Sequence, residues 1–322
     1  MKGKGFKKKL SDYTFIVTGA TGFLGSAFVR TLLEHQAKVI IISRKSSNHW
    51  RLDKYKGKYI VITTQLCDLS DFQVDNPRKS ILVHFAASGV NQREDDVEGM
   101  VQANIMGTYS VLNFANHKKL KRIVIIGTSG EYGPGYRLTE TAPLRPTSDY
   151  GATRASATLL TRSYCERRNI DYTILRPFAV YGPYEAPYRL IPYAIIQALK
   201  RQTVKISSGQ QTRDYIYIDD VIRGITSACL SDEASGKIFN ICTGIETSVK
   251  QVVSHIVSIM GDSVDIQAGA IDNIPGEMWR TTGNPELAYE VLNWKPRYNL
   301  EQGLIETIKW FQTTGSKLKN YT

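Results

Sequence analysis

The chain has 322 residues, of which 42% are hydrophobic and 22% are charged. These fractions are typical of globular domains, so they exclude a disordered or fibrous chain, and the length suits one or two closely packed lobes. The formal net charge of +11 favours anionic small molecules over nucleic acid, because much of the excess lies in a basic tail (residues 1–10) and no basic stretch is interleaved with aromatic residues.

Short β-branched runs alternate with amphipathic stretches in the first half of the chain, a pattern typical of parallel strands joined by crossover helices. Nearly all of these runs are continuously apolar, as expected when helices cover both faces of a sheet. The expected strands are Phe15–Thr18, Lys38–Ile42, Tyr59–Thr63, Ile81–Phe85, Arg122–Ile126 and Tyr172–Leu175. The sequence therefore predicts an α/β fold with a Rossmann-type doubly wound parallel sheet.

After Pro177, frequent prolines punctuate shorter elements and indicate a smaller, discontinuous C-terminal lobe. We expect the sheet domain over residues 11–182, a return to the sheet over about 214–243, and the smaller lobe over residues 183–322.

Four scattered cysteines, Cys67, Cys165, Cys229 and Cys242, show no CxxC spacing and no neighbouring pair of histidines. This spacing argues against a metal site and against a disulfide framework. The apolar stretch 15–20 is too short to span a bilayer or to form a signal-peptide core. We therefore expect a cytoplasmic protein with no metal, no membrane partner and no nucleic-acid partner.

A glycine-rich motif lies between the first strand and the first helix. Glycines at this place allow a tight turn and let the backbone approach a pyrophosphate at the helix N-terminus. Because the motif directly follows a strand and opens a long helix, it predicts a dinucleotide cradle, although a purely structural glycine turn is the alternative. The expected contacts are Gly19, Thr21, Gly22, Phe23, Leu24 and Gly25.

The end of the second strand distinguishes NAD from NADP. A carboxylate there holds the ribose 2′-hydroxyl of NAD, whereas an arginine accommodates the 2′-phosphate of NADP. The chain has Arg44 at this place, with Ser43, Lys45 and Ser46 as helpers and no acidic residue before Asp53. This pattern predicts NADP(H) over NAD(H), because the guanidinium fork suits a phosphate. A solvated basic loop is the alternative.

Asp68 follows the third strand, where its carboxylate can accept a hydrogen bond from the adenine amino group. An aspartate at the start of a helix is also an ordinary N-cap, and the two roles are compatible.

A phenol, a cation and a hydroxyl form the expected catalytic set. Tyr150 and Arg154 lie four residues apart at the start of a long helix, so they share a face. A cation makes a phenol lose its proton more easily, which suits proton exchange with a substrate hydroxyl or carbonyl. The fifth strand ends near Thr128, where open α/β sheets deliver catalytic groups.

With these motifs the chain resembles the extended short-chain dehydrogenase/reductases, specifically their branch of sugar-nucleotide epimerases, dehydratases and reductases. The resemblance covers nearly the whole chain in ordered motifs. These are GATGFLG (19–25), HFAA (84–87), NIMGT (104–108), GTSGEYG (127–133), YGATR (150–154), RPFAVYGP (176–183), RDYIYIDDV (213–221), FNICTG (239–244) and LNWKPRYNLEQGLIETIKW (292–310).

The resemblance implies that Tyr150 is the acid/base, that Thr128 hydrogen-bonds the reacting oxygen and that Arg154 binds the nicotinamide ribose. Further implied cofactor contacts are Asp68, Leu69, Ala86, Ala87, Asn104, Pro177 and Tyr150 itself. Implied substrate contacts are Ser88, Ser129, Gly130, Arg189, Arg213 and Arg280. The alternative for the last three is an ordinary surface arginine or ion-pair partner.

Two departures from the family pattern narrow the reaction. Arg154 replaces a lysine, so the charge is kept but a proton relay through this side chain is lost, and a catalytically silent dinucleotide-binding protein becomes an alternative. The dehydratases of the family carry an Asp-Glu pair where this chain has Ser129 and Gly130, and Glu131 lies one place further along. A dehydratase is therefore not expected, because elimination of water needs an extra acid and base.

Together these features predict NADPH-dependent reduction of a keto group, at C4 of a nucleotide-linked 4-keto-6-deoxy sugar. The alternative within the same chemistry is a sugar-nucleotide C4-epimerase that keeps its NAD(P) bound. The resemblance also implies a homodimer formed through the helix that carries Tyr150 and the crossover helix before it.

Overall fold

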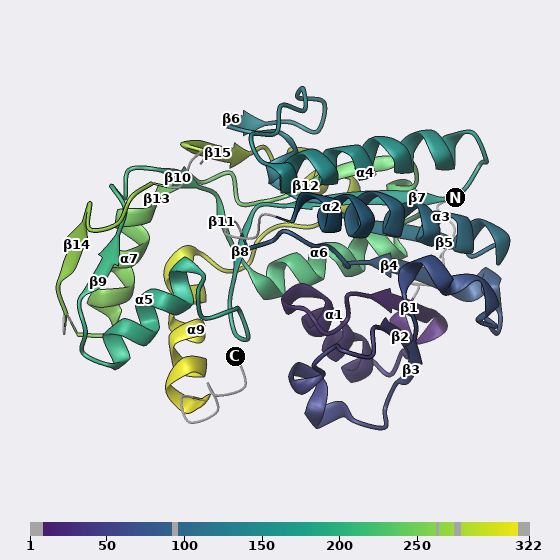
Figure 1. Cartoon of the computed structure of the whole chain (residues 1–322), viewed down its shortest axis with the longest axis horizontal. Helices are drawn as coiled ribbons and strands as arrows, with labels where there is room; N and C mark the ends of the chain where they lie inside the picture. Colours follow the sequence, from purple (N-terminus) through teal and green to yellow (C-terminus); the bar gives the residue numbers. More distant parts are fainter. Residues whose placement is uncertain (1–8, 92–95, 262–263, 274–277, 315–322) are drawn as a thin grey trace, which may run out of the picture. The chain divides into compact units, whose positions relative to one another are not determined.

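The computed structural model describes residues 9–91, 96–261, 264–273 and 278–314 (Figure 1). Residues 1–8 of the expected basic tail lie outside these described residues. The chain divides into two compact units. The first comprises Met1–Ile126, Ser156–Ile174 and Ile222–Ile238, and the second comprises Gly127–Ala155, Leu175–Val221 and Phe239–Thr322. The boundary expected at residue 182 stays a prediction.

A seven-stranded sheet in the order β12-β7-β5-β4-β1-β2-β3 forms the centre of the first unit, and β7 and β12 run on into the second (Figure 1). Its strands are β1 (Thr14–Thr18), β2 (Lys38–Ser43), β3 (Ile60–Thr63), β4 (Ser80–His84), β5 (Arg122–Ile126), β7 (Tyr172–Pro177) and β12 (Lys237–Ile241). The neighbouring strands pair in parallel from β3 to β2, from β2 to β1, from β1 to β4 and from β4 to β5. The Rossmann-type fold is thus confirmed, and the six expected strands end within two residues of the observed ones.

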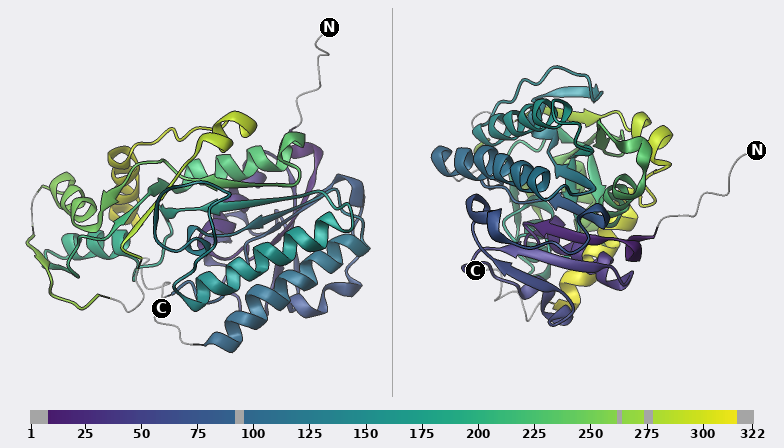
Figure 2. Two further views of the ribbon diagram at one scale, coloured as in Figure 1. Left: turned by 90° about the horizontal axis from the view of Figure 1, so that it is seen from above. Right: turned by 90° about the vertical axis from the view of Figure 1, so that its right-hand side faces the viewer.

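The strand order reverses between β1 and β4, which in an open α/β sheet marks the ligand-binding edge. Right-handed crossovers then place the helices on both faces. These helices are α1 (Phe23–Glu34), α2 (Val97–Met100), η5 (Val101–Met106), α3 (Gly107–His117), α4 (Asp149–Glu166) and α6 (Ile218–Leu230). Helices α3 and α4 run side by side (Figure 2), where the Tyr109 and Tyr164 rings meet edge to face at 6.1 Å.

Burial of continuous apolar strands holds this unit together. The side chains of Phe15, Ile16 and Val17 on β1 are fully buried, as are those of Ile81, Leu82 and Val83 on β4. Short 3₁₀ helices connect the remaining elements. They are η1 (Leu10–Asp12), η2 (Trp50–Tyr55), η3 (Leu66–Asp71), η4 (Pro77–Lys79) and η7 (Asp232–Ala234).

The described residues of the second unit form three small sheets. A four-stranded sheet has the order β13 (Thr247–Ser248), β10 (Thr212–Arg213), β15 (Arg280–Gly283) and β6 (Gly135–Leu138). Two pairs join β11 (Tyr215–Tyr217) to β8 (Ala179–Tyr181), and β14 (Ile266–Ala268) to β9 (Val204–Ile206). The helices are η6 (Ser129–Glu131), α5 (Leu190–Leu199), α7 (Val249–Ile259), α8 (Glu286–Leu292) and α9 (Leu300–Thr314).

Asp214 fixes the strands of the second unit to one another. Its buried carboxylate accepts hydrogen bonds from the backbone N–H groups of Thr243, Gly244 and Gly283. Burial nevertheless raises the pKa of Asp214 to about 6. None of the described helices combines the length and the apolar character needed to cross a bilayer.

Candidate active site

The glycine motif forms a tight turn at the end of β1 that only glycine can make. Gly19 has a φ of +65°, and a Cβ atom on it would lie 2.5 Å from the backbone nitrogen of Ala86. The N–H of Gly22 donates to the Gly19 carbonyl at 3.1 Å and closes the turn. A Cβ atom on Gly25 would collide with the same carbonyl, so Gly25 allows α1 to start directly against the turn.

These contacts leave the first turn of α1 suited to an anion. Gly22 occupies the N-cap position, and no side chain of the described residues caps the helix there. The N–H groups at a helix N-terminus without a capping side chain carry a partial positive charge that attracts phosphate. The turn therefore fits a dinucleotide pyrophosphate, with Thr21 on the loop and Phe23 and Leu24 as the first two residues of α1.

The end of β2 presents the expected cations to solvent. Arg44, Lys45 and Ser46 are exposed, and no ion pair joins Arg44 or Lys45 to another described residue. Ser43 is buried, and its Oγ atom lies 3.3 Å from His49 Nε2. Cationic side chains without a carboxylate partner are available to an anionic ligand.

The loop after β4 is held by a buried hydrogen-bond network. Thr18 Oγ1 lies 2.6 Å from His84 Nδ1, and Thr108 Oγ1 lies 3.3 Å from His84 Nε2. Asn104, inside the π-helical turn η5, accepts from the Ser88 N–H at 2.9 Å and donates to the Ser88 carbonyl at 3.0 Å. Asn104 thus fixes the loop 86–88, and its expected direct contact with a cofactor stays a prediction.

The other expected cofactor contacts lie on separate elements. Asp68 is exposed in η3 at a non-helical φ/ψ, and the neighbouring Leu69 is buried. Ala87 is half-buried between Ala86 and Ser88, and Pro177 is buried at the end of β7. Their contacts with a dinucleotide stay predictions.

In the second unit the structure brings the phenol, the hydroxyl and the cation together. Thr128 and Glu131 form a capping box around η6: Thr128 Oγ1 accepts from the Gly130 N–H, and Glu131 accepts from the Thr128 N–H at 3.0 Å. A Cβ atom on Gly151 would lie 2.5 Å from the Gly130 carbonyl oxygen. Glycine at 151 therefore lets the first turn of α4, which carries Tyr150, approach this loop.

The surroundings of Tyr150 raise its pKa above the ordinary value of 10.0. Burial is the main cause and Glu131 adds to it, whereas Arg154, Arg189 and a hydrogen bond with Thr128 act in the opposite direction. As expected, Arg154 by itself lowers the pKa of Tyr150. The pKa is nevertheless raised overall, because burial disfavours the charged phenolate more strongly than Arg154 favours it. The phenol is therefore protonated at neutral pH.

Glu131 is committed to a buried ion pair. Its carboxylate is fully buried and lies 2.8 Å from Arg176 Nε. Arg176 also donates to the Tyr132 hydroxyl at 2.7 Å, and that hydroxyl donates to Asn240 at 2.8 Å. A buried carboxylate held this way is a structural anchor for the Thr128 loop.

The three arginines expected at the substrate have different partners. Arg189 is the N-cap residue of α5, and its Nε lies 3.5 Å from Glu185 Oε1. Arg213 donates to the carbonyl of its neighbour Thr212 at 2.8 Å. Arg280 makes a bidentate pair with Glu246, with both distances 2.7 Å.

An anionic substrate has to compete with Glu246 for Arg280. The guanidinium of Arg280 also lies over the Tyr136 ring, 3.9 Å from its centroid. Sequence reasoning missed Glu246 and the burial of Glu131, because their partners lie 34 and 45 residues away in the chain. It also missed Glu185, although the spacing of four residues to Arg189 is a local signal that could have found this pair.

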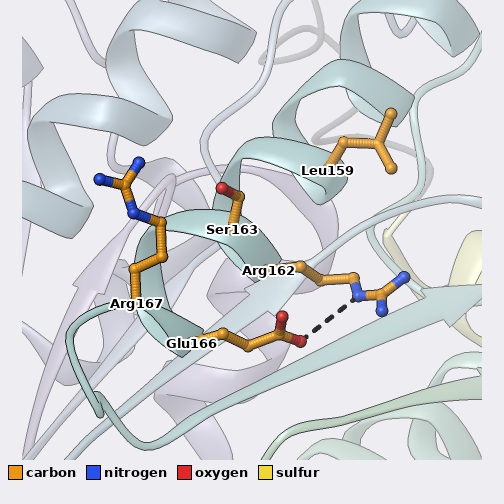
Figure 3. A pocket seen from close by; sticks show the side chains of 5 residues that line it. All are labelled: Leu159, Arg162, Ser163, Glu166 and Arg167. Atoms are coloured by element: carbon orange, nitrogen blue, oxygen red, sulfur yellow. Dashed lines mark ion pairs between the residues drawn. The ribbon is translucent and has the colours of Figure 1, made fainter.

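A shallow hollow on the outer side of α4 contains none of the expected site residues. It is lined by Leu159, Arg162, Ser163, Glu166 and Arg167, and Figure 3 shows Arg162 paired with Glu166 at 3.7 Å. Four of the five residues belong to α4, and Arg167 directly follows its end. The hollow therefore offers no convergent catalytic groups.

The glycine turn, the switch in strand order and the Tyr150 cluster define a dinucleotide-dependent α/β enzyme. The family model described as "NAD dependent epimerase/dehydratase family" matches residues 15–242, and the protein belongs to this family of sugar-nucleotide enzymes. The resemblance seen in the sequence is thus confirmed.

Three relatives show the range of the family. The low-salt glycan biosynthesis protein Agl12 of Haloferax volcanii is 28% identical over 92% of this chain and 97% of its own length. The dTDP-D-glucose 4,6-dehydratase of Homo sapiens is 25% identical over 98% of this chain and 93% of its own length. A solved structure of UDP-glucuronic acid 4-epimerase from Bacillus cereus contains UDP-glucuronic acid and NAD. It is 28% identical over 93% of this chain and 99% of its own, with a TM-score of 0.84.

Proposed function

We propose that the protein reduces a keto group of a nucleotide-linked sugar with NADPH, at C4 of a 4-keto-6-deoxy sugar. The observation that carries this proposal is the grouping of the Tyr150 phenol with the Thr128 hydroxyl and the Arg154 guanidinium, in surroundings that raise the pKa of the phenol. Reduction of a ketone needs a group that arrives with a proton to give. A half-buried phenol that keeps its proton at neutral pH meets that need.

In this mechanism the hydroxyl of Thr128 holds the ketone oxygen, and Tyr150 Oη donates its proton to that oxygen. Reduced nicotinamide, when bound, supplies the hydride. Arg154 stabilises the phenolate that Tyr150 becomes, because its charge opposes the cost of burial. Arg154 does not relay protons, since a guanidinium keeps its charge at neutral pH.

The surroundings of Glu131 argue against a dehydratase, although some relatives have that name. Ser129 and Gly130 carry no carboxylate at the positions of the Asp-Glu pair. Glu131 is buried and paired with Arg176, so it is not available as an additional acid. This favours simple hydride and proton transfer.

The preference for NADPH is supported by the exposed cations Arg44 and Lys45 at the end of β2. Changing Arg44 to Asp and Lys45 to Ala is expected to weaken NADPH binding more than NADH binding. Equal losses for the two dinucleotides refute the 2′-phosphate assignment.

A C4-epimerase is the second candidate, because a relative of similar fold is a 4-epimerase solved with NAD. Purified protein distinguishes the two with a nucleotide-linked 4-keto-6-deoxy sugar and a nucleotide-linked 4-hydroxy sugar. Net loss of NADPH absorbance with the ketone supports reduction. Interconversion of the hydroxy sugars without added cofactor supports epimerisation, and dinucleotide binding without either reaction supports the catalytically silent alternative.

A homodimer through α3 and α4 and a cytoplasmic location stay predictions. The exposed apolar side chains of Met106 and Tyr109 near α3 and of Leu159 on α4 support the dimer. Light scattering on the purified protein tests it, with the mass of a monomer as the contradicting result.

A further inference from the structure

The segment after β2 folds back onto the glycine turn. The contact between Ser43 Oγ and His49 Nε2 closes the loop that carries Arg44. Two residues after His49, in η2, Arg51 Nη1 donates to the Thr21 carbonyl at 3.3 Å. Arg51, which the sequence analysis did not single out, therefore touches the turn that fits the pyrophosphate.

Contacts hold both the guanidinium and the backbone of Arg51 in place. It lies over the ring of Trp50, 4.6 Å from the centroid. The backbone carbonyl of Arg51 accepts a hydrogen bond from Arg30 Nη1 on α1, and the same nitrogen donates to Ser26. Arg51 is half-buried, whereas Arg44 is exposed. A cation fixed before a ligand arrives loses less conformational entropy on binding it.

The contact with Thr21 and the strand register together bring Arg51 to the side of the glycine turn that faces the end of β2. Thr18 at the end of β1 pairs with Ile42 on β2, so the turn that begins at Gly19 leaves the sheet next to Ser43 and Arg44. In this fold the ribose 2′ position lies at the end of the second strand, and the pyrophosphate lies over the glycine turn. Arg51 reaches the turn at the corner between these two points.

We infer that Arg51 is a second ligand of the 2′-phosphate of NADP(H), in addition to Arg44, and so a determinant of cofactor choice. This inference rests on the proposed preference for NADPH. A 2′-phosphate is a doubly charged anion near neutral pH, and two guanidinium forks match its charge and its oxygens. Arg51 contributes a contact that is held in advance by Thr21 and Trp50, and the exposed Arg44 contributes the second charge.

Calorimetric titration of the full-length protein with two cofactor fragments tests the inference without turnover. The fragments are adenosine 2′,5′-bisphosphate and adenosine 5′-diphosphate, of which only the first has a 2′-phosphate. The Arg51→Gln variant is expected to bind the bisphosphate at least ~10-fold more weakly, because it loses a charged hydrogen bond. Its affinity for adenosine 5′-diphosphate should stay within about twofold of wild type. Lys56→Gln removes the same charge from an exposed residue at the end of η2 and should change neither affinity.

Equal losses for both fragments in Arg51→Gln overturn the inference, because Arg51 then only supports the glycine turn. Unchanged affinity for the bisphosphate overturns it as well. A wild-type protein without preference for the bisphosphate refutes the NADPH preference itself, together with the inference. The two failures are therefore distinguished by the wild-type titration alone.

Discussion

Replacing Glu185 with glutamine is expected to stabilise the protein at and above neutral pH. Glu185 follows β8, and its residue exposure is only 6%. Within the described part of the chain, its buried Oε2 atom has no hydrogen-bond partner. Burial raises the pKa of this carboxyl from 4.5 to about 7, and Arg189 only partly opposes the effect.

The size of the effect follows from this change in pKa. As pH rises from about 4.5 to about 7, the unfolded chain releases the Glu185 proton while the folded protein keeps it. The free energy of unfolding therefore falls over this window and levels off above it. The total loss corresponds to about 3 kcal/mol, and glutamine, which does not ionise, avoids it.

Urea unfolding followed by tryptophan fluorescence, from about pH 4 to about pH 8, measures this loss. Between these two pH values, the free energy of unfolding of wild type should fall by about 3 kcal/mol relative to that of Glu185→Gln. Glu290→Gln, which changes an exposed carboxyl on α8, is the matched control and should follow wild type. Parallel curves for wild type and Glu185→Gln would show that Glu185 ionises freely in the folded protein, which refutes the reasoning.

Three further substitutions test the local account. Gly25→Ala forces a Cβ atom against the Gly19 carbonyl. We expect the free energy of unfolding to fall by about 1–3 kcal/mol and dinucleotide binding to weaken. Unchanged binding contradicts the close packing. Arg176→Met leaves Glu131 buried without its partner and should cost about 3–5 kcal/mol in urea unfolding. Arg154→Met should raise the pKa of Tyr150, because Arg154 lowers it. The fall in reduction rate at high pH should therefore shift to higher pH in this variant. Arg154→Lys keeps a charge and should shift it less.

The sheet and the glycine turn were predictable because their signals are local. Continuous apolar runs such as 81–85 specify a strand that is covered on both faces, and the spacing of three glycines specifies the turn after it. The strand order was not readable from these runs, since it depends on which crossovers pack on which face.

The candidate site was predictable in its members but not in its electrostatics. The spacing of Tyr150 and Arg154 placed them on one helical face, yet the net direction of the Tyr150 pKa depends on burial, which no local pattern reports. Glu131 and Arg176 lie 45 residues apart, and Arg51 reaches a turn 30 residues before it. Such pairings appear only once the chain is folded.

Turnover by Tyr150→Phe, measured together with NADPH binding, tests the central claim most directly. With a nucleotide-linked 4-keto-6-deoxy sugar, the variant should lose about 10²–10⁴-fold in rate, because the proton donor is gone while the ring remains. Its affinity for NADPH should equal that of wild type. A Tyr150→Phe protein that reduces the ketone at the wild-type rate contradicts the account.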